Sequence, residues 1–422
     1  MASAGRTARG LRRIPGTRPR PADQAPRGSA PKKKEAPRRG EKSGLFYLGA
    51  GVDTHLLVLI LVLLAIGLVM LFSASYANSY YYYGDSYYFI RRQAGFAVFG
   101  VACMLAISMV DYHILERFST FLAVLSVALL AFLLICRYAH ITQIAKPVGE
   151  ATRWLRFGPL EFQPSEVAKF GVILLFAHLI SHRLEKMNTF FYGVAPFGAI
   201  LLVFAGLIYL ENHLSGTLII LLIGASMMFV GGTRPRWFVL GALLLAALLM
   251  YVFFIKGGYQ RQRIDAWLDP WSETVDPDQT YQTRQSLYAI GSGGLLGVGL
   301  GQSRQKYLYL PEPQNDFIFA IVCEELGLVG ALVIIVLFAL LIWRGYVISV
   351  NAPDAFGRLL GLGITFQIGL QVVLNICVVT NSLPNTGISL PFFSYGGTSL
   401  VMLLGEMGVL LGISRRSNLE KT

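Results

Sequence analysis

The sequence predicts an all-α membrane protein that crosses the bilayer about ten times. Of its 422 residues, 54% are hydrophobic and only 14% are charged, whereas roughly 25% of the residues of a soluble domain are charged. In addition, ten stretches are apolar and long enough to span or nearly span a bilayer. Because a backbone in lipid must satisfy its own hydrogen bonds, we expect these stretches to be helices of one polytopic domain, residues 51–416.

The predicted spans follow one another with mostly short connections. In chain order they are Leu56–Phe72, Ala94–Val110, Phe118–Cys136, Pro164–Ile180, Val194–Leu210, Leu214–Gly231, Trp237–Ile255, Phe317–Trp343, Leu359–Val379 and Leu400–Ile413. The last span is short, which suits a tilted or partly re-entrant helix. The connection between the seventh and eighth spans, residues 256–316, is long enough to be a large outer loop with a function of its own.

Lysine and arginine near the span ends predict the orientation. Residues 1–50 contain 13 Lys and Arg against 3 Asp and Glu, a net charge of +10. This arm is rich in Pro and Gly without hydrophobic periodicity, so we expect it to be disordered and cytoplasmic. Ten crossings return the tail, residues 417–422, to the cytoplasmic side. Arg91 and Arg92 oppose this orientation locally.

Asp316 is the most informative single residue. It stands at the end of the outer loop, directly before the span that begins at Phe317. A carboxylate at the edge of a membrane helix is costly to bury, so it usually has a partner and a function. The segments 151–169 and 387–399 also lie at span ends, and the topology places all three on the same side of the membrane.

The segment 151–169 leads into a helix that Pro164 is suited to begin. Ser165, Glu166 and Lys169 then share one helix face. A lysine at this depth needs a carboxylate, and either Glu166 in its own helix or Asp316 on another could serve. The spacing leaves both pairings open.

The outer loop has signs of order. Tyr281–Ile290 has helical spacing, and Gly291–Gly301 permits tight turns and close approach to a ligand. No nucleotide-binding motif is present, because the glycines do not follow a strand and open a helix. The six histidines show no metal-ligand spacing. In the ninth span Gln367, Gln371 and Asn375 recur every four residues; we interpret them as hydrogen-bonding to neighbouring helices, with a wet cavity as the alternative.

Several of these stretches together resemble the SEDS family (FtsW, RodA and SpoVE), and the division branch most closely. They are Leu71–Tyr76 (LFSASY), Ala151–Leu155 (ATRWL), Gln163–Lys169 (QPSEVAK), Gly299–Gly330 and Gly387–Ser399. The likeness extends over roughly residues 53–416, including the ten-span layout and the long outer loop. Glu161 departs from it, because some members carry a basic residue there.

The resemblance implies a peptidoglycan glycosyltransferase of the bacterial cytoplasmic membrane. Such enzymes polymerise lipid II, a disaccharide-pentapeptide on undecaprenyl diphosphate, at the outer membrane face during cell division. The acidic catalytic residue of the family matches Asp316, and its membrane lysine matches Lys169. The resemblance therefore favours pairing of Lys169 with Asp316.

The chemistry of the reaction suits these residues. The 4-hydroxyl of the acceptor sugar attacks the anomeric carbon of the donor while diphosphate leaves, and a carboxylate general base such as Asp316 assists this attack in one inverting step. Lys169 would orient Asp316 or neutralise diphosphate, and Arg153 and Lys306 are candidates for anion binding. The further expected substrate contacts are Trp154, Gln163, Ser165, Glu166, Glu312, Ser394, Tyr395 and Gly396, the last three by hydroxyls and open backbone N–H groups.

The expected partners are lipid II, a class B penicillin-binding protein acting as transpeptidase, and other membrane proteins of the division complex, but no nucleic acid. No organic cofactor is expected, and the diphosphate leaving group is compatible with Mg²⁺ or Mn²⁺. Two alternatives are a lipid II flippase or transporter, which would use the polar interior for translocation, and a non-catalytic scaffold for a transpeptidase.

Overall fold

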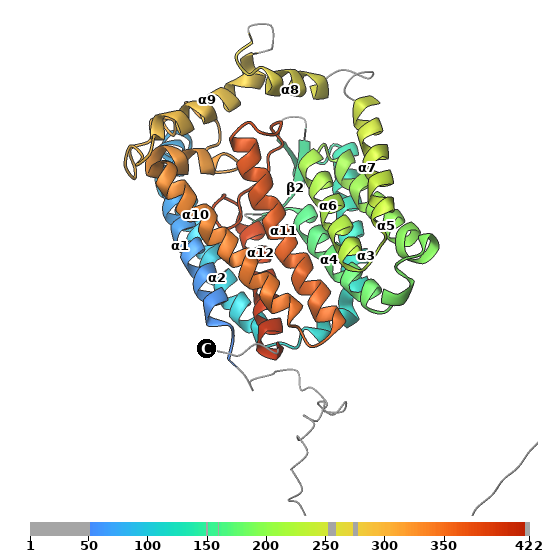
Figure 1. Cartoon of the computed structure of the whole chain (residues 1–422). Coiled ribbons are helices and arrows are strands. Elements are labelled where there is room, and N and C mark those ends of the chain that lie inside the picture. Colours follow the sequence, from blue (N-terminus) through green and yellow to red (C-terminus); the bar gives the residue numbers. More distant parts are fainter. Residues whose placement is uncertain (1–50, 149–150, 159, 252–258, 273–276, 418–422) are drawn as a thin grey trace, which may run out of the picture. The chain divides into compact units, whose positions relative to one another are not determined.

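The computed structural model describes residues 51–148, 151–158, 160–251, 259–272 and 277–417. The predicted arm 1–50 and all of the tail except Ser417 lie outside these residues. The described part is a bundle of long helices (Figure 1). The predicted all-α class is therefore confirmed for the bulk of the chain.

Ten helices of the described residues correspond to the ten predicted spans. They are α1 (Thr54–Tyr83), α2 (Tyr88–Ser108), α3 (His113–Tyr138), α4 (Pro164–Ser181), α5 (Ala195–Leu210), α6 (Leu214–Val230), α7 (Pro235–Met250), α10 (Ile318–Val350), α11 (Ala355–Val379) and α12 (Gly397–Arg416). A 3₁₀ turn (Leu184–Lys186) and a π-helical turn (Phe190–Val194) precede α5. The last span, expected to be short, has 20 residues.

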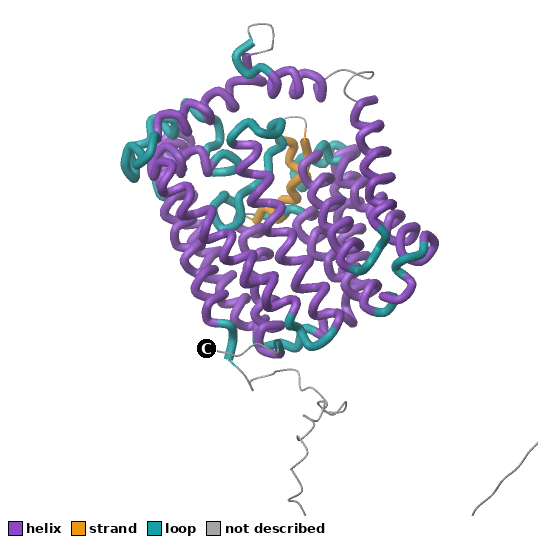
Figure 2. The backbone as a smooth tube through the Cα atoms, in the orientation of Figure 1, coloured by secondary structure: helices purple, strands orange, loops and turns teal. Residues whose placement is uncertain are grey.

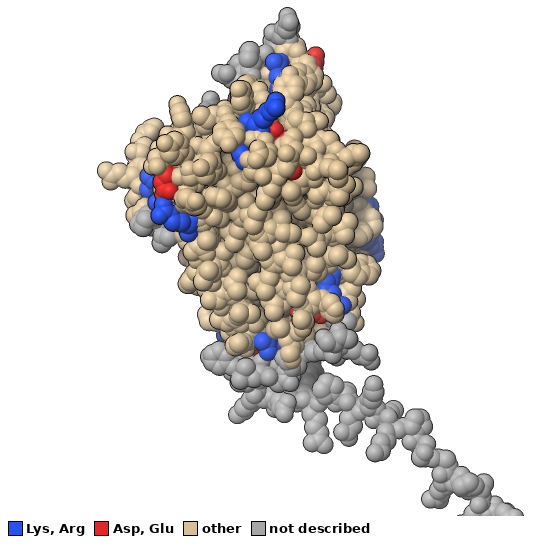
Figure 3. All heavy atoms as spheres, turned by 90° about the vertical axis from the view of Figure 1, so that its left-hand side faces the viewer, with Lys and Arg blue, Asp and Glu red and all other residues tan. Residues whose placement is uncertain are grey.

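Eight of these helices, within the described residues, are long and apolar enough to cross a membrane. The other two, α6 and the apolar part of α7, are shorter. Figure 3 shows a broad uncharged band on one face of the bundle, with the charged side chains near its two ends. The innermost helices are α4, α11 and α12, which bury 72%, 67% and 67% of their most apolar stretch, against 22% for α2.

A small antiparallel sheet, which the sequence analysis did not predict, lies between α3 and α4. Its strands β1 (Ala145–Val148), β2 (Ala151–Phe157) and β3 (Leu160–Phe162) pair in the order β1-β2-β3. The turn between Phe157 and Leu160 contains Gly158 with a φ of +62°, a conformation that glycine adopts without steric cost. Figure 2 shows the strands near one end of the bundle, among several loops.

The outer loop contains two further helices, α8 (Tyr259–Leu268) and α9 (Pro277–Gly293). In Figure 1 both run across one end of the bundle. The helix expected over Tyr281–Ile290 is thus confirmed as part of α9. Ser286 Oγ donates to the carbonyl oxygen of Val379 at 2.8 Å, and Trp267 Nε1 donates to that of Asn381 at 3.0 Å, so both helices contact the end of α11.

The glycine-rich segment after α9 packs against a break in α10. Gly327 interrupts this helix with a φ of +67° and a ψ of −170°. The carbonyl groups of Glu324 and Glu325, which the break leaves without helical partners, accept from the N–H groups of Val298 and Gly299 at 3.0 and 3.1 Å. A break at this depth is tolerated because another segment satisfies the freed groups. The close approach that these glycines permit is made to α10.

Lys306 joins the outer loop to the same break. Its Nζ lies 3.0 Å from Glu325 Oε1 and donates to Ser73 Oγ of α1 at 3.2 Å and to the Gly301 carbonyl at 2.6 Å. Both charged side chains are almost fully buried. The expectation that Lys306 binds anions at the site is therefore wrong: its charge is neutralised by Glu325, and its donors serve the protein.

Two glycines with the same φ of +79° allow a matched test of this packing. A Cβ on Gly297 would lie 2.1 Å from the carbonyl oxygen of Glu325, whereas a Cβ on Gly301 would meet nothing within 4 Å. We expect Gly301→Ala to cost about 1–2 kcal/mol through its backbone conformation, and Gly297→Ala about 1–3 kcal/mol more through the clash. Thermal unfolding of the purified variants in detergent measures the difference; equal losses would contradict it.

The buried Lys306–Glu325 pair is a second test. Lys306→Met leaves Glu325 as an uncompensated buried charge, which costs about 3–5 kcal/mol. Adding Glu325→Gln should restore much of the lost thermal stability. Arg91→Met is the control, because Arg91 pairs with Asp85 at an exposed position and its loss should cost less than about 1 kcal/mol. A Lys306→Met protein as stable as the Arg91→Met protein would refute the structural role of Lys306.

Candidate active site

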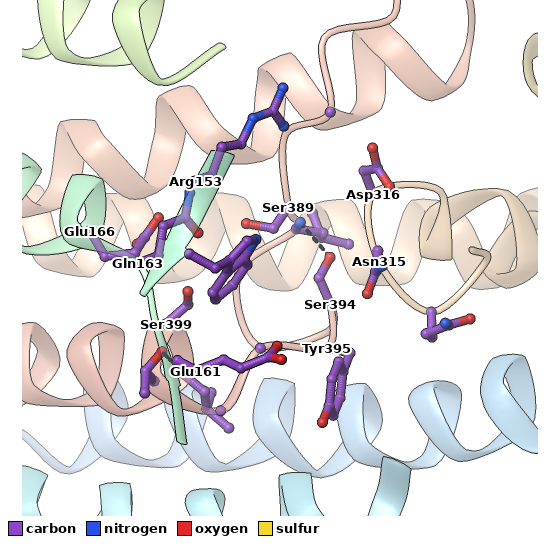
Figure 4. Close-up of a pocket in the computed structure, with 18 of the residues that line it drawn as sticks. Arg153, Glu161, Gln163, Glu166, Asn315, Asp316, Ser389, Ser394, Tyr395 and Ser399 are labelled. Atoms are coloured by element: carbon purple, nitrogen blue, oxygen red, sulfur yellow. Dashed lines mark hydrogen bonds between the residues drawn. The ribbon is translucent and has the colours of Figure 1, made fainter. Parts of the chain in front are cut away.

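A cavity of about 1230 Å³ opens at the end of the bundle where the sheet and the outer loop lie. Asp316 and the segments 151–169 and 387–399, which the sequence singled out, all contribute residues to the wall of this cavity. Their predicted location on the same side of the protein is therefore confirmed. Every predicted site residue except Lys306 is in its wall: Arg153, Trp154, Gln163, Ser165, Glu166, Lys169, Glu312, Asp316, Ser394, Tyr395 and Gly396. Figure 4 shows Asp316 and Asn315 on one side, Glu161, Gln163 and Glu166 on the other, and Ser389 and Ser394 between them.

Asp316 lies where the outer loop enters α10. Asn375 of α11 fixes its backbone: Asn375 Nδ2 donates to the carbonyl oxygen of Asp316 at 2.8 Å and to that of Ile388 at 2.6 Å. One amide group thus joins the two loops that border the cavity. Asn375 was expected to hydrogen-bond to neighbouring helices; its partners are instead the two loops, and they give the backbone of Asp316 a fixed position.

Gly387 allows Asp316 to approach the neighbouring loop and Arg153. A Cβ built on Gly387 would lie 3.1 Å from Asp316 Oδ2 and 3.9 Å from Arg153 Nη1. Arg153 reaches this point from β2, and its Nη2 donates to the Asn212 carbonyl in the turn between α5 and α6 at 3.0 Å. A carboxylate and a guanidinium are therefore present together at one wall of the cavity.

Lys169 pairs within its own helix. Its Nζ lies 2.9 Å from Glu166 Oε2, and the lysine side chain is 4% exposed. The pairing with Asp316 that the resemblance favoured is therefore wrong for this structure. The reason is local: residues three apart on a helix face each other, so Glu166 neutralises the buried ammonium without a contact between helices.

Glu312 is the second carboxylate near Asp316. It accepts hydrogen bonds from Gln314 Nε2 at 2.8 Å and Asn315 Nδ2 at 3.1 Å. Burial, and then the charge of Asp316, raise the pKa of Glu312 above its ordinary value. Both causes act in the same direction, because burial and a like charge each disfavour the ionised form.

The loop before α12 uses its polar groups to hold its own shape. Ser394 Oγ accepts from Leu390 N at 2.7 Å, Tyr395 N donates to the Gln314 carbonyl at 2.8 Å, and Gly396 N donates to Gln93 Oε1 at 3.2 Å. The expectation of open backbone N–H groups at Tyr395 and Gly396 is therefore wrong. Buried backbone donors are nearly always paired, so the side chains of Ser394 and Tyr395, which line the cavity, are the candidate contacts of this loop.

Sequence reasoning missed several residues of the cavity wall. Arg92 lies in the wall, with its guanidinium 4.3 Å from the centre of the Tyr88 ring; its conflict with the positive-inside pattern was the available signal. Of the polar stripe already noted in the ninth span, Gln367 and Gln371 line the cavity, and Gln367 donates to Glu406 at 2.7 Å. The stripe on α11 therefore combines both interpretations, bonding to a neighbouring helix and bordering a cavity.

Two more polar residues of the wall had no signal in the sequence. His213, in the turn between α5 and α6, is buried, and burial followed by the charges of Arg153 and Lys169 lowers its pKa. Arg156 pairs with Glu161 across β2 and β3. The acidic residue that departs from the family pattern therefore has a basic neighbour, which only the register of the unpredicted sheet reveals.

Comparison with known proteins agrees with this architecture. The family model of the cell cycle proteins FtsW, RodA and SpoVE matches residues 54–419. The chain is 40% identical over 369 residues to stage V sporulation protein E of Bacillus subtilis, covering 86% of this chain and 97% of that protein. It is 37% identical over 365 residues to the probable peptidoglycan glycosyltransferase FtsW of Geobacter metallireducens, covering 86% of this chain and 95% of that protein.

Two solved structures share the fold. One belongs to a peptidoglycan synthase complex that coordinates polymerization and crosslinking, with 27% identity, a TM-score of 0.72 and coverage of 87% of this chain and 98% of that chain. The other is the rod shape determining protein RodA of Thermus thermophilus, with 26% identity, a TM-score of 0.64 and coverage of 89% of this chain and 99% of that chain. The resemblance drawn from the sequence motifs is thereby confirmed: the chain belongs to the FtsW, RodA and SpoVE family.

Proposed function

We propose that this peptidoglycan glycosyltransferase polymerises lipid II in the cavity, with Asp316 as the general base. The observation that carries the proposal is the fixed position of Asp316 in the cavity wall, beside Gly387 and Arg153. The oxygen of the acceptor 4-hydroxyl forms a bond to the anomeric carbon of the donor. The bond from that carbon to the diphosphate oxygen breaks, and the hydroxyl proton passes to a carboxylate oxygen of Asp316. A single displacement of this kind inverts the anomeric centre.

The cavity size supports a reaction between two large substrates. Its volume of about 1230 Å³ exceeds the roughly 300–1,000 Å³ of pockets for drug-sized ligands. The donor and the acceptor each bring a sugar unit, so a large shared cavity is required. Gln163, Ser165, Trp154, Ser394 and Tyr395 are the proposed sugar contacts, because they offer hydroxyl and amide groups and an aromatic face.

Arg153 is the proposed contact of the leaving diphosphate. It lies on the same wall as Asp316, and a fixed cation stabilises the negative charge that develops as the bond to the anomeric carbon breaks. Lys169 is proposed to act as one half of its ion pair with Glu166, which fixes the orientation of both side chains in the cavity wall. Arg156, beside Glu161, takes the place of the basic residue that some family members carry.

A divalent cation such as Mg²⁺ would neutralise part of the diphosphate charge when bound. Glu312 and Asp316, two of the four acidic residues in the cavity wall, lie close to each other and would hold the ion. A Mg²⁺ site of one or two carboxylates completed by substrate phosphates is a common arrangement. The residues present therefore fit such an ion.

The cavity is proposed to face the outside of the cytoplasmic membrane, with both termini in the cytoplasm. The basic residues at the span ends support this orientation. A penicillin-binding protein that crosslinks the glycan is the proposed partner, because the related solved structure is a complex that coordinates polymerization and crosslinking.

Asp316→Asn should lower glycan polymerisation at least about 100-fold, because the amide keeps the shape but cannot accept the hydroxyl proton. The measurement is polymer formed from lipid II by purified protein in detergent. Detergent removes the two sides of the membrane, so a flippase or a scaffold would form no polymer even as wild type. Glu185→Gln, the same chemical change at an exposed position outside the cavity wall, is the control. Normal rates in Asp316→Asn would remove Asp316 from the mechanism.

Lys169 and Glu166 should contribute to polymerisation as one ion pair and not as two independent residues. Because they pair with each other, we expect Lys169→Ala and Glu166→Gln to reduce polymerisation by similar factors. The double variant should be little worse than either single one, with a coupling energy of about 0.5–3 kcal/mol. Additive losses would show that the two residues act separately, and a far larger loss for Lys169→Ala would assign the lysine a direct substrate contact.

A further inference from the structure

Three potential metal ligands converge at the end of α3 and α4 that lies away from the cavity. Glu116 is in the first turn of α3, His178 is in the last turn of α4, and His182 directly follows α4. The spacing of the six histidines along the sequence predicted no metal site. In the structure His178 and His182, four residues apart, both approach the carboxylate of Glu116 on the adjacent helix.

The distances among these groups are short. Both imidazole rings approach the same carboxylate oxygen: Glu116 Oε1 lies 3.4 Å from His178 Nδ1 and 3.6 Å from His182 Nδ1. The ring centroids of the two histidines are 4.7 Å apart. One potential ligand atom from each of the three residues lies within 4.8 Å of the other two. Among the described residues this is the only such group of three.

These distances suit a tetrahedral zinc site. Zinc binds imidazole nitrogen and carboxylate oxygen at about 2.0–2.2 Å, so neighbouring ligand atoms of a tetrahedron are about 3.3–3.6 Å apart. The two nitrogen-to-oxygen distances match this edge length. We propose that Glu116, His178 and His182 form a binding site for a divalent transition metal of the Zn²⁺ type, with water as the fourth ligand.

Access and ligand supply agree with this site. The side chain of His182 is 61% exposed, that of His178 30% and that of Glu116 23%, so an ion and its water can reach all three residues. His182 Nδ1 lies 2.9 Å from the His178 carbonyl oxygen, and binding through this nitrogen replaces that contact by the bond to the metal. Imidazole nitrogen with one carboxylate favours zinc over magnesium, which prefers oxygen ligands.

The metal would act as a clip between two packed helices. α3 and α4 pack against each other, and α4 carries Glu166 and Lys169 in the cavity wall near its other end. The nine residues from Lys169 to His178 separate the two sites by about 14 Å along the helix. The clip lies apart from the proposed catalytic groups, so its role is to stabilise the helix pair, independently of whether the proposed function is correct.

The test is binding of Zn²⁺ to the full-length protein, purified in detergent by a tag without histidines. Isothermal titration should give one site, and Co²⁺ should give the visible absorption of a tetrahedral complex. Zn²⁺ should also raise the unfolding temperature, because a ligand that binds only the folded state stabilises it. Mg²⁺ at the same concentration should produce neither effect.

His178→Ala and His182→Ala should each weaken Zn²⁺ binding by at least about tenfold, since each removes one of three protein ligands, and the double variant should lose it. His140→Ala is the matched control, because His140 is exposed at the other end of α3 and outside the cluster. Elution as a monodisperse peak verifies that each variant is folded. Absence of a site in the wild type, or equal affinity in the double variant and the control, would overturn the proposal and leave ordinary Glu116–His ion pairs.

Discussion

The break in α10 is the constraint on which the outer half of the molecule depends. A membrane helix that stops at Gly327 exposes carbonyl groups that lipid cannot satisfy. The glycine-rich segment supplies the missing donors at Val298 and Gly299, and it can do so only because its backbone comes within contact of α10. The buried Lys306–Glu325 pair then joins the same loop to α1 and α10. Together these contacts fix the chain that leads, ten residues later, to Asp316.

The second support of Asp316 comes from α11. Asn375 bonds the carbonyl groups of Asp316 and Ile388, so the catalytic candidate and the loop before α12 are held by one side chain. That loop is held in turn by Gln93 and by the Gln314 carbonyl. In the wall around Asp316, backbone groups of both loops therefore form hydrogen bonds within the protein. Such a wall is preorganised, which is what a general base requires if its oxygen is to meet the acceptor hydroxyl.

The helical spans could be predicted from the sequence, because a span through lipid requires a long apolar stretch. The position of Asp316 in the cavity wall could be predicted because a carboxylate beside such a stretch is costly to bury without a partner or a function. The contacts of charged residues were less predictable. Lys306 and Lys169 are both buried cations. Lys306 pairs with Glu325 because the helix break brings the outer loop to α10. Lys169 pairs with Glu166 because of the side-chain rotamers that the two residues adopt on α4. Spacing alone left the partner of Lys169 open, and the family likeness favoured the wrong one.

The surroundings of the carboxylates in the cavity support Asp316, rather than a neighbouring carboxylate, as the proposed base. Glu166 and Glu161 form ion pairs with Lys169 and Arg156, whereas Glu312 and Asp316 lie close to each other. Burial and the charge of Asp316 raise the pKa of Glu312, so Glu312 takes up a proton at a higher pH than a glutamate in water does. Two adjacent carboxylates with unequal surroundings divide their functions in this way. Asp316 shares its wall with the guanidinium of Arg153, which places a cation beside both the proposed base and the diphosphate that leaves.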